Sequence, residues 1–132
     1  LATVARVWRA GCIIRAAILE PMRAAFERRR DLCLRILKGT PGLDLFAPEG
    51  TFYLFPRVTA FLGPRKGAAA ITGDGDLVSW LLDETGVATV PGSAFAAPGH
   101  LRISFAASEA SLEKGLGLMR EALVRLGPAS RA

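Results

Sequence analysis

Two segments with the apolar spacing of a helix enclose a stretch of short apolar runs, and this order limits the folds that the chain can adopt. Apolar residues recur every three or four positions over 21–38 and again after Ser108, a spacing that gathers them on one face of a helix. Pro21 suits a first helical turn, Ser108 suits an N-cap, and Gly127 suits a helix end. The side chains that we expect to face the core are Met22, Ala25, Phe26, Cys33, Ile36 and Leu37 in the first helix and Leu112, Leu116, Met119, Leu123 and Leu126 in the second.

Four short runs rich in aromatic and β-branched residues lie between these two helices, and turn residues such as Pro and Gly separate them. This composition predicts strands. The four expected strands cover 43–47, 51–56, 87–90 and 101–105. The first two are expected to pair as antiparallel neighbours across a Pro-Glu-Gly turn.

A third helix fits between the second and third strands, with Asp74 or Asp76 as its cap and Gly86 at its end. Its inward side chains would be Leu77, Trp80 and Leu81. The order α-β-β-α-β-β-α predicts an α/β fold of the two-layer α+β type, in which helices cover a small mixed or antiparallel sheet. A chain of 132 residues, 51% of them hydrophobic, suits one such domain around a single core.

The net charge of +5 is unevenly distributed, because residues 1–38 carry nine basic and three acidic side chains and the remainder sums to −1. This basic third supports an alternative function: a non-enzymatic binding module that contacts nucleic acid or an anionic membrane. However, a nearly neutral remainder is a poor phosphate-binding surface, and Arg28, Arg29 and Arg30 point in different directions on a helix. We therefore expect solvated or ion-paired arginines, with neither nucleic acid nor a membrane as a partner.

The two cysteines, Cys12 and Cys33, stand in apolar surroundings without metal-ligand spacing, which indicates buried thiols in a reducing compartment. The acid-free first nineteen residues have no convincing leader, so the expected location is cytoplasmic. The single histidine, His100, cannot build a histidine-rich metal site. We expect no metal ligands, and we interpret His100 as a partly exposed loop side chain.

Arg102 is the strongest candidate for a binding role. Strand alternation places Leu101, Ile103 and Phe105 on one face and Arg102 with Ser104 on the other. A covered guanidinium in an otherwise uncharged strand needs a planar anionic partner, and a substrate carboxylate supplies one in a bidentate fork. A structural role, as an exposed strand residue or in an ion pair, fits the spacing equally well. The acids considered for such a pair are Asp31, Asp44, Glu49 and Asp83.

Six segments match one known family in the same order. They are FERRRD (26–31), PGL (41–43), PEGTFYLFP (48–56), LLDE (81–84), GVATVPGSAF (86–95) and LRISFA (101–106). Together they resemble the C-terminal small domain of the class I/II, fold-type I, pyridoxal-phosphate-dependent aminotransferases, near the aspartate aminotransferase group. The resemblance covers about 22–126, which leaves 1–21 as an unmatched segment with helical spacing and 127–132 as a tail.

This resemblance implies an enzyme that transfers an amino group between an amino acid and a 2-oxo acid. It also implies pyridoxal 5'-phosphate as the cofactor and a homodimer as the assembly. In the family, the arginine of the Leu-Arg-Ile-Ser strand binds the α-carboxylate of the substrate, and Arg102 stands at that place. The resemblance leaves open which amino acid is the donor.

The matched region lacks the residues on which the family's cofactor chemistry depends. In the family, the lysine that binds the cofactor lies upstream, and Lys38, Lys66 and Lys114 stand in no matching motif. Ala96 stands where the family commonly has Gly, and the chain begins with Leu1 rather than Met. We therefore expect a fragment of an aminotransferase that is inactive alone, with Arg102 as its substrate-binding residue and no catalytic or cofactor-binding residue.

Overall fold

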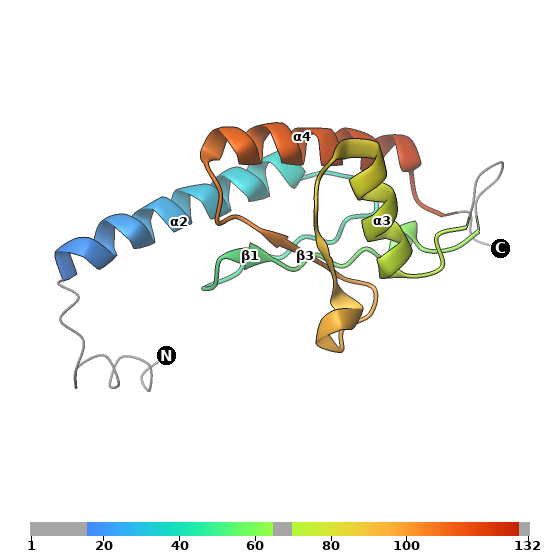
Figure 1. Ribbon diagram of the computed structural model, residues 1–132, viewed down its shortest axis with the longest axis horizontal. Coiled ribbons are helices and arrows are strands. Elements are labelled where there is room, and N and C mark those ends of the chain that lie inside the picture. Colours follow the sequence, from blue (N-terminus) through green and yellow to red (C-terminus); the bar gives the residue numbers. More distant parts are fainter. Residues whose placement is uncertain (1–15, 65–69, 130–132) are drawn as a thin grey trace.

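The computed structural model describes residues 16–64 and 70–129, which form three α-helices and a three-stranded antiparallel sheet (Figure 1). The helices are α2 (Ala16–Leu37), α3 (Asp74–Thr85) and α4 (Glu109–Leu126). The strands are β1 (Tyr53–Leu54), β2 (Val90–Pro91) and β3 (Leu101–Ser104), and the 3-10 helices are η1 (Thr59–Phe61) and η2 (Gly92–Phe95). β3 is the central strand of the order β1-β3-β2. The predicted two-layer fold class is confirmed, and its sheet is antiparallel.

The two faces of β3 have different environments. Leu101, Ile103 and Phe105 are buried, whereas Arg102 is partly buried and Ser104 is exposed, as the alternation predicts. Helices α2 and α4 lie side by side over the sheet, and α3 packs against α4 (Figure 1). The buried helical side chains that complete the core are Leu32, Cys33, Leu37, Leu77, Leu81, Leu112, Leu116, Met119, Ala122 and Leu123.

Helix α2 extends further toward the N-terminus than predicted, to Ala16, and it continues through Pro21. A proline inside a helix removes one backbone hydrogen bond, but the surrounding Ala, Leu, Glu, Met and Arg residues are good helix formers. The guanidinium of Arg23 also forms ion pairs with Glu20 at 2.6 Å and with Glu27 at 3.1 Å on the same helix. These local interactions explain why the helix does not begin at the proline.

The prediction that Met22 faces the core is wrong, since its side chain is 54% exposed. The N-terminal half of α2 extends beyond the sheet, so helical spacing there has no core to face (Figure 1). Leu19 is exposed on the same half. In the other half the prediction is confirmed, because Cys33 and Leu37 are buried.

The predicted strand over 43–47 is not formed, so the element order is α-β-α-β-β-α. Among the described residues, this run is joined to the following one by a single antiparallel bridge, between Asp44 and Arg57. Phe46 and Ala47 are exposed. Leu43 and Leu45 are partly buried against the core, so side-chain packing holds this run even though it does not form a strand ladder.

The strand predicted at 87–90 is also shorter than expected, because β2 begins only at Val90. The backbone N–H of Val87 donates to the hydroxyl of Thr85 at 3.1 Å, so it is used at the end of α3. The predicted end of α3 is confirmed, with Gly86 in the left-handed conformation at φ 70°.

The thiol of Cys33 is fully buried in the core, as predicted. Burial raises its pKa to about 11, so the thiol is neutral near pH 7. A neutral buried thiol behaves as a small apolar side chain. Cys12 lies outside the described residues.

Thr89 precedes β2 with a side chain only 9% exposed, and its hydroxyl has no hydrogen-bond partner among the described residues. A buried polar group without a partner costs about 1–3 kcal/mol. We predict that Thr89→Val, which removes the hydroxyl and keeps the shape, raises the free energy of unfolding by about 1 kcal/mol, measured by urea unfolding. Thr89→Ser retains the hydroxyl and should be less stable than the original chain. No gain in Thr89→Val would contradict the prediction.

Candidate functional site

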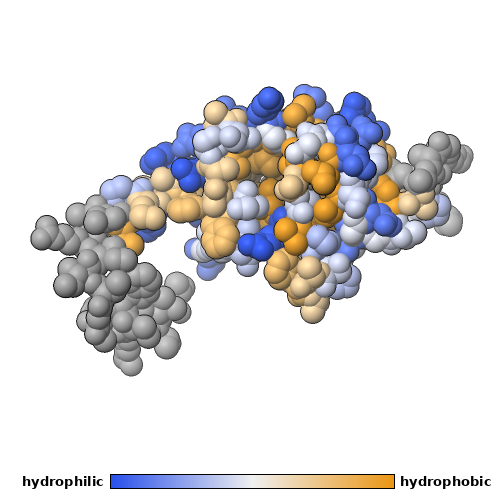
Figure 2. Space-filling model, viewed as in Figure 1, coloured by the Kyte–Doolittle hydropathy of each residue, from blue (hydrophilic) through white to orange (hydrophobic). Residues whose placement is uncertain are grey.

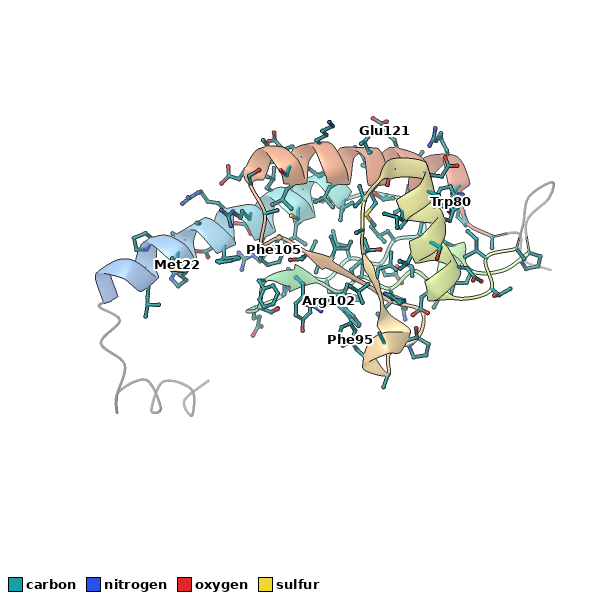
Figure 3. The ribbon with its side chains drawn as sticks, in the orientation of Figure 1. Met22, Trp80, Phe95, Arg102, Phe105 and Glu121 are labelled. Carbon is teal, nitrogen blue, oxygen red and sulfur yellow. The ribbon has the colours of Figure 1, made fainter. Side chains whose placement is uncertain are left out.

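Arg102 lies on the face of β3 opposite the buried apolar side chains, and three aromatic rings surround its guanidinium. The guanidinium carbon lies 4.9 Å from the ring centroid of Tyr53, 5.2 Å from that of Phe95 and 5.8 Å from that of Phe52. These distances are typical of cation–π contacts. Figure 3 shows Arg102 directed toward Phe95, on the side of the sheet away from α4.

The aromatic side chains also contact one another and line a cleft. Phe55 lies edge-on to Tyr53 and to Phe95, with ring centroids 6.4 Å and 6.5 Å apart. The cleft has a volume of about 490 Å³, and its lining residues are Tyr53, Phe55, Phe95, Ala97 and Arg102. In Figure 2 the tip of the molecule formed by η2 has a hydrophobic surface. Among the described residues, Arg102 is therefore the one charged side chain in an otherwise aromatic and apolar lining.

The charge of Arg102 has no carboxylate within 4.0 Å among the described residues. Asp31 instead pairs with Arg30 at 2.8 Å, and Asp44 pairs with Arg57 at 2.7 Å. None of the four acids considered from the sequence approaches Arg102. An internal ion pair therefore does not explain this arginine in the part of the chain that the structure describes.

Two turns hold Phe52 and Phe95 beside the guanidinium. Thr51 adopts φ 72°, a conformation that β-branched residues rarely adopt, and its hydroxyl accepts the Phe52 N–H at 2.6 Å. The carbonyl of Phe52 then accepts the N–H of Phe105 at 2.8 Å. Phe95 is carried by η2, which begins at Gly92, where a side chain would collide with the carbonyl oxygen of Ala97.

Asp74 supports the second of these turns. The sequence suggests Asp74 or Asp76 as the helix cap, but the N-cap is Gly73, and Asp76 lies in the first turn, where its carboxylate accepts the backbone N–H groups of Thr72 and Gly73. Asp74 instead accepts the N–H of Ser93 at 2.8 Å. Sequence reasoning missed this contact. Two acids in one first turn, where one is enough for capping, could have indicated a second role.

Burial and hydrogen bonding have opposite effects on the Asp74 carboxyl. Burial would raise its pKa, but hydrogen bonds from Ser93, Gly99 and Gly75 together outweigh burial and hold the pKa below its ordinary value. The carboxylate is therefore charged near neutral pH. Its negative charge is stabilised by backbone N–H groups and the hydroxyl of Ser93.

His100 is a partly exposed loop residue, as predicted. Its ring stacks on Phe55, with centroids 5.2 Å apart and planes 8° from parallel. The Nδ1 atom lies 3.2 Å from the carbonyl oxygen of Pro98. His100 therefore extends the aromatic cluster beyond Phe55.

In the basic cluster of α2, the prediction of solvated or ion-paired arginines is confirmed for Arg28 and Arg30. Arg28 lies 3.8 Å from Glu109, and Arg30 pairs with Asp31. The guanidinium of Arg29 lies over the ring of Phe26 at 5.4 Å. The described part of the chain has no cluster of three metal-binding side chains, and none of its helices is long and apolar enough to span a membrane.

Comparison with known proteins identifies the family. The profile of the aminotransferase class I and II family matches residues 9–117, and the chain belongs to that family. The match begins within 1–21, the segment that the motifs leave unassigned. A probable aspartate/prephenate aminotransferase of Aquifex aeolicus is 47% identical over 105 residues, which cover 80% of this chain and 25% of that protein. An aspartate aminotransferase of Rhizobium meliloti is 40% identical over 109 residues, 82% of this chain and 27% of that protein.

Solved structures agree with this assignment. The crystal structure of the aspartate aminotransferase from Rhizobium meliloti matches with a TM-score of 0.76 and 38% identity, covering 88% of this chain and 28% of that one. The aromatic aminotransferase from Pyrococcus horikoshii matches with a TM-score of 0.70 and 34% identity, covering 83% and 27%. The chain thus spans about a quarter of the length of the curated relatives it matches.

Full-length members of this family use pyridoxal phosphate, which binds to an enzyme lysine. The cleft beside Arg102 has no lysine in its lining. Lys38 follows the end of α2 and Lys114 is exposed on α4, while Lys66 lies outside the described residues. The cleft residues therefore do not fit the cofactor by themselves.

Ala96 ends η2 in the left-handed conformation, at φ 56° and ψ 27°. This conformation costs a non-glycine residue about 1–2 kcal/mol, and part of the gain from glycine is lost to the entropy of the unfolded chain. We predict that Ala96→Gly raises the free energy of unfolding by about 0.5–1 kcal/mol, measured by urea unfolding. Ala97→Gly, at a residue without positive φ, should be destabilising. Equal effects of the two changes would contradict the prediction.

Proposed function

We propose that this chain is the part of an aminotransferase that binds the substrate's α-carboxylate, with Arg102 as the binding residue. The enzyme would transfer an amino group between an amino acid and a 2-oxo acid. The observation that carries this proposal is the guanidinium of Arg102, which is surrounded by aromatic rings and has no carboxylate partner among the described residues.

The surroundings of Arg102 suit a planar anion. A guanidinium can donate two parallel hydrogen bonds to one carboxylate, which fixes the orientation of the bound acid as well as its position. The guanidinium carbon lies over the rings of Tyr53 and Phe95, and such cation–π contacts do not require the N–H groups as hydrogen-bond donors. An apolar lining also reduces competition from water, which strengthens the charge-assisted hydrogen bonds.

Other parts of the enzyme would bind the cofactor. Pyridoxal phosphate, when bound, supplies the electron-withdrawing group through which amino transfer occurs. In this chain, Arg102 would bind and orient the substrate, while the aromatic cluster would limit the access of water. We therefore propose that the chain alone is inactive.

We also propose a homodimeric enzyme in the cytoplasm. Leu19 and Met22 on α2 are exposed apolar side chains, and further parts of the enzyme, from the same or a second copy, would cover them. A buried free thiol at Cys33 suits a reducing compartment. The alternative of a nucleic-acid or membrane-binding module is not favoured, because the arginines of α2 interact with nearby acids and an aromatic ring.

We predict that Arg102→Lys weakens the binding of 2-oxoglutarate to this chain. Lysine retains the charge but cannot form the bidentate hydrogen bonds. We expect this loss to weaken the free energy of binding by about 1.5–3 kcal/mol, or roughly a 10- to 150-fold increase in Kd. An NMR titration that follows the backbone amides of Tyr53 and Phe95 measures this change. Arg120→Lys, on the exposed side of α4, is the matched control and should leave Kd unchanged. Equal Kd values for the Arg102→Lys variant and the original chain would exclude Arg102 from the site.

We predict that the purified chain does not catalyse amino transfer. Incubation with pyridoxal phosphate should give no stoichiometric lysine-linked visible absorbance, because no lysine lines the cleft. Supplied with aspartate, alanine or an aromatic amino acid, the chain should form no 2-oxo acid. The Rhizobium meliloti aspartate aminotransferase, assayed in parallel, controls for the reagents. Turnover by the chain alone would disprove this part of the proposal.

A further inference from the structure

The loop over 92–99 is closed at its base and carries Phe95 near its centre. The N–H of Gly92 donates to the carbonyl of His100 at 2.8 Å, and the N–H of Ala97 donates to the carbonyl of Gly92 at 3.0 Å. Phe95 itself is 49% exposed, so the core does not hold its ring in place. Whatever fixes the base of this loop therefore also determines where the ring lies against Arg102.

Asp74 binds the loop from the start of α3. Its carboxylate accepts the N–H of Ser93 at 2.8 Å, although the two residues are 19 positions apart. Asp74 is only 5% exposed, and no basic side chain of the described residues pairs with it.

A buried carboxylate without a cationic partner depends on hydrogen bonds for its stability. Here, the hydrogen bond from the N–H of Ser93 comes from the loop itself. If the loop opened, the charge would lose this bond and remain partly buried, so carboxylate and loop stabilise each other. The other acid of the same helical turn, Asp76, forms its hydrogen bonds with Thr72 and Gly73, outside the loop.

We propose that Asp74 is a positioning residue for Arg102: by binding the N–H of Ser93 at the start of the loop 92–99, it holds the ring of Phe95 against the guanidinium. A guanidinium confined between Phe95 and Tyr53 has fewer orientations, so less freedom is lost when a carboxylate binds. This inference rests on the proposed role of Arg102 in binding the substrate's carboxylate. It adds a residue of α3 to the determinants of that site.

The first test uses the full 132-residue chain without ligand and records the NMR signal of the Arg102 side-chain Nε–Hε group. Ring currents from Phe95 and Tyr53 should displace this signal from that of a free arginine. Asp74→Asn should move the signal toward the free value, whereas Asp76→Asn, the same change two residues away, should not. Equal responses to the two changes would overturn the proposal, because a general loss of stability would affect both.

Two further variants keep this test decisive. Phe95→Leu removes the ring of a half-exposed side chain, so the chain should remain folded, and the Arg102 signal should shift as in Asp74→Asn. If Asp74→Asn prevents folding, Asp74→Glu replaces it, because glutamate retains the charge but displaces the loop. An Arg102 signal unchanged in folded Asp74→Glu or in Phe95→Leu would overturn the proposal.

The second test measures Kd for 2-oxoglutarate in a double-mutant cycle. Asp74→Asn should raise Kd by about three- to tenfold in the original chain and have no further effect in the Phe95→Leu background. The same increase in both backgrounds would show that Asp74 does not act through Phe95. If the original chain binds no 2-oxoglutarate, the proposed function fails, while the Arg102 signal of the free chain still decides the role of Asp74.

Discussion

The alternation of side chains along β3 is the constraint on which the rest of the structure depends. Leu101, Ile103 and Phe105 anchor the sheet in the core, and the same period of two directs Arg102 to the opposite face. A shift of one residue would place the guanidinium in the core and expose three apolar side chains. Packing and the candidate site therefore specify the same register.

The two strands that pair with β3 contribute to both the core and the candidate site. β1 pairs with it antiparallel and brings Tyr53 beside Arg102, while Leu54 is buried on the core side. β2 pairs on the other edge and leads directly into η2, which carries Phe95. A sheet with only two residues in each outer strand is enough to bring these aromatic side chains around one arginine.

Local sequence signals predicted the features that depend on local chemistry. Ser108 caps α4 by accepting the N–H of Ser111 at 3.2 Å, and Gly86 ends α3 in the left-handed conformation. The orientation of Arg102 was also predictable, because alternation in a strand requires no knowledge of its partners. The resemblance to aminotransferases, carried by six segments, indicated the family that the comparisons then identified.

The features that the sequence did not reveal depend on distant parts of the chain. Met22 has the spacing of a core residue, but the sheet formed by the described residues does not reach that half of α2. The run over 43–47 has the composition of a strand, yet within the described residues it forms a single bridge, between Asp44 and Arg57. Asp74 resembles a helix cap, and only the folded chain brings it to Ser93. Each depends on tertiary contacts, which override local preference.

The unequal surroundings of α2 have a consequence for its dynamics. Local opening of a helix is opposed mainly by tertiary packing, so its free energy should rise along α2 from the projecting half to the half that contains Cys33 and Leu37. Backbone amides near Met22 would then exchange with solvent faster than those near Cys33, although both belong to one continuous helix. Any part of the enzyme that covers the projecting half would slow this exchange, which makes the helix a sensitive reporter of assembly.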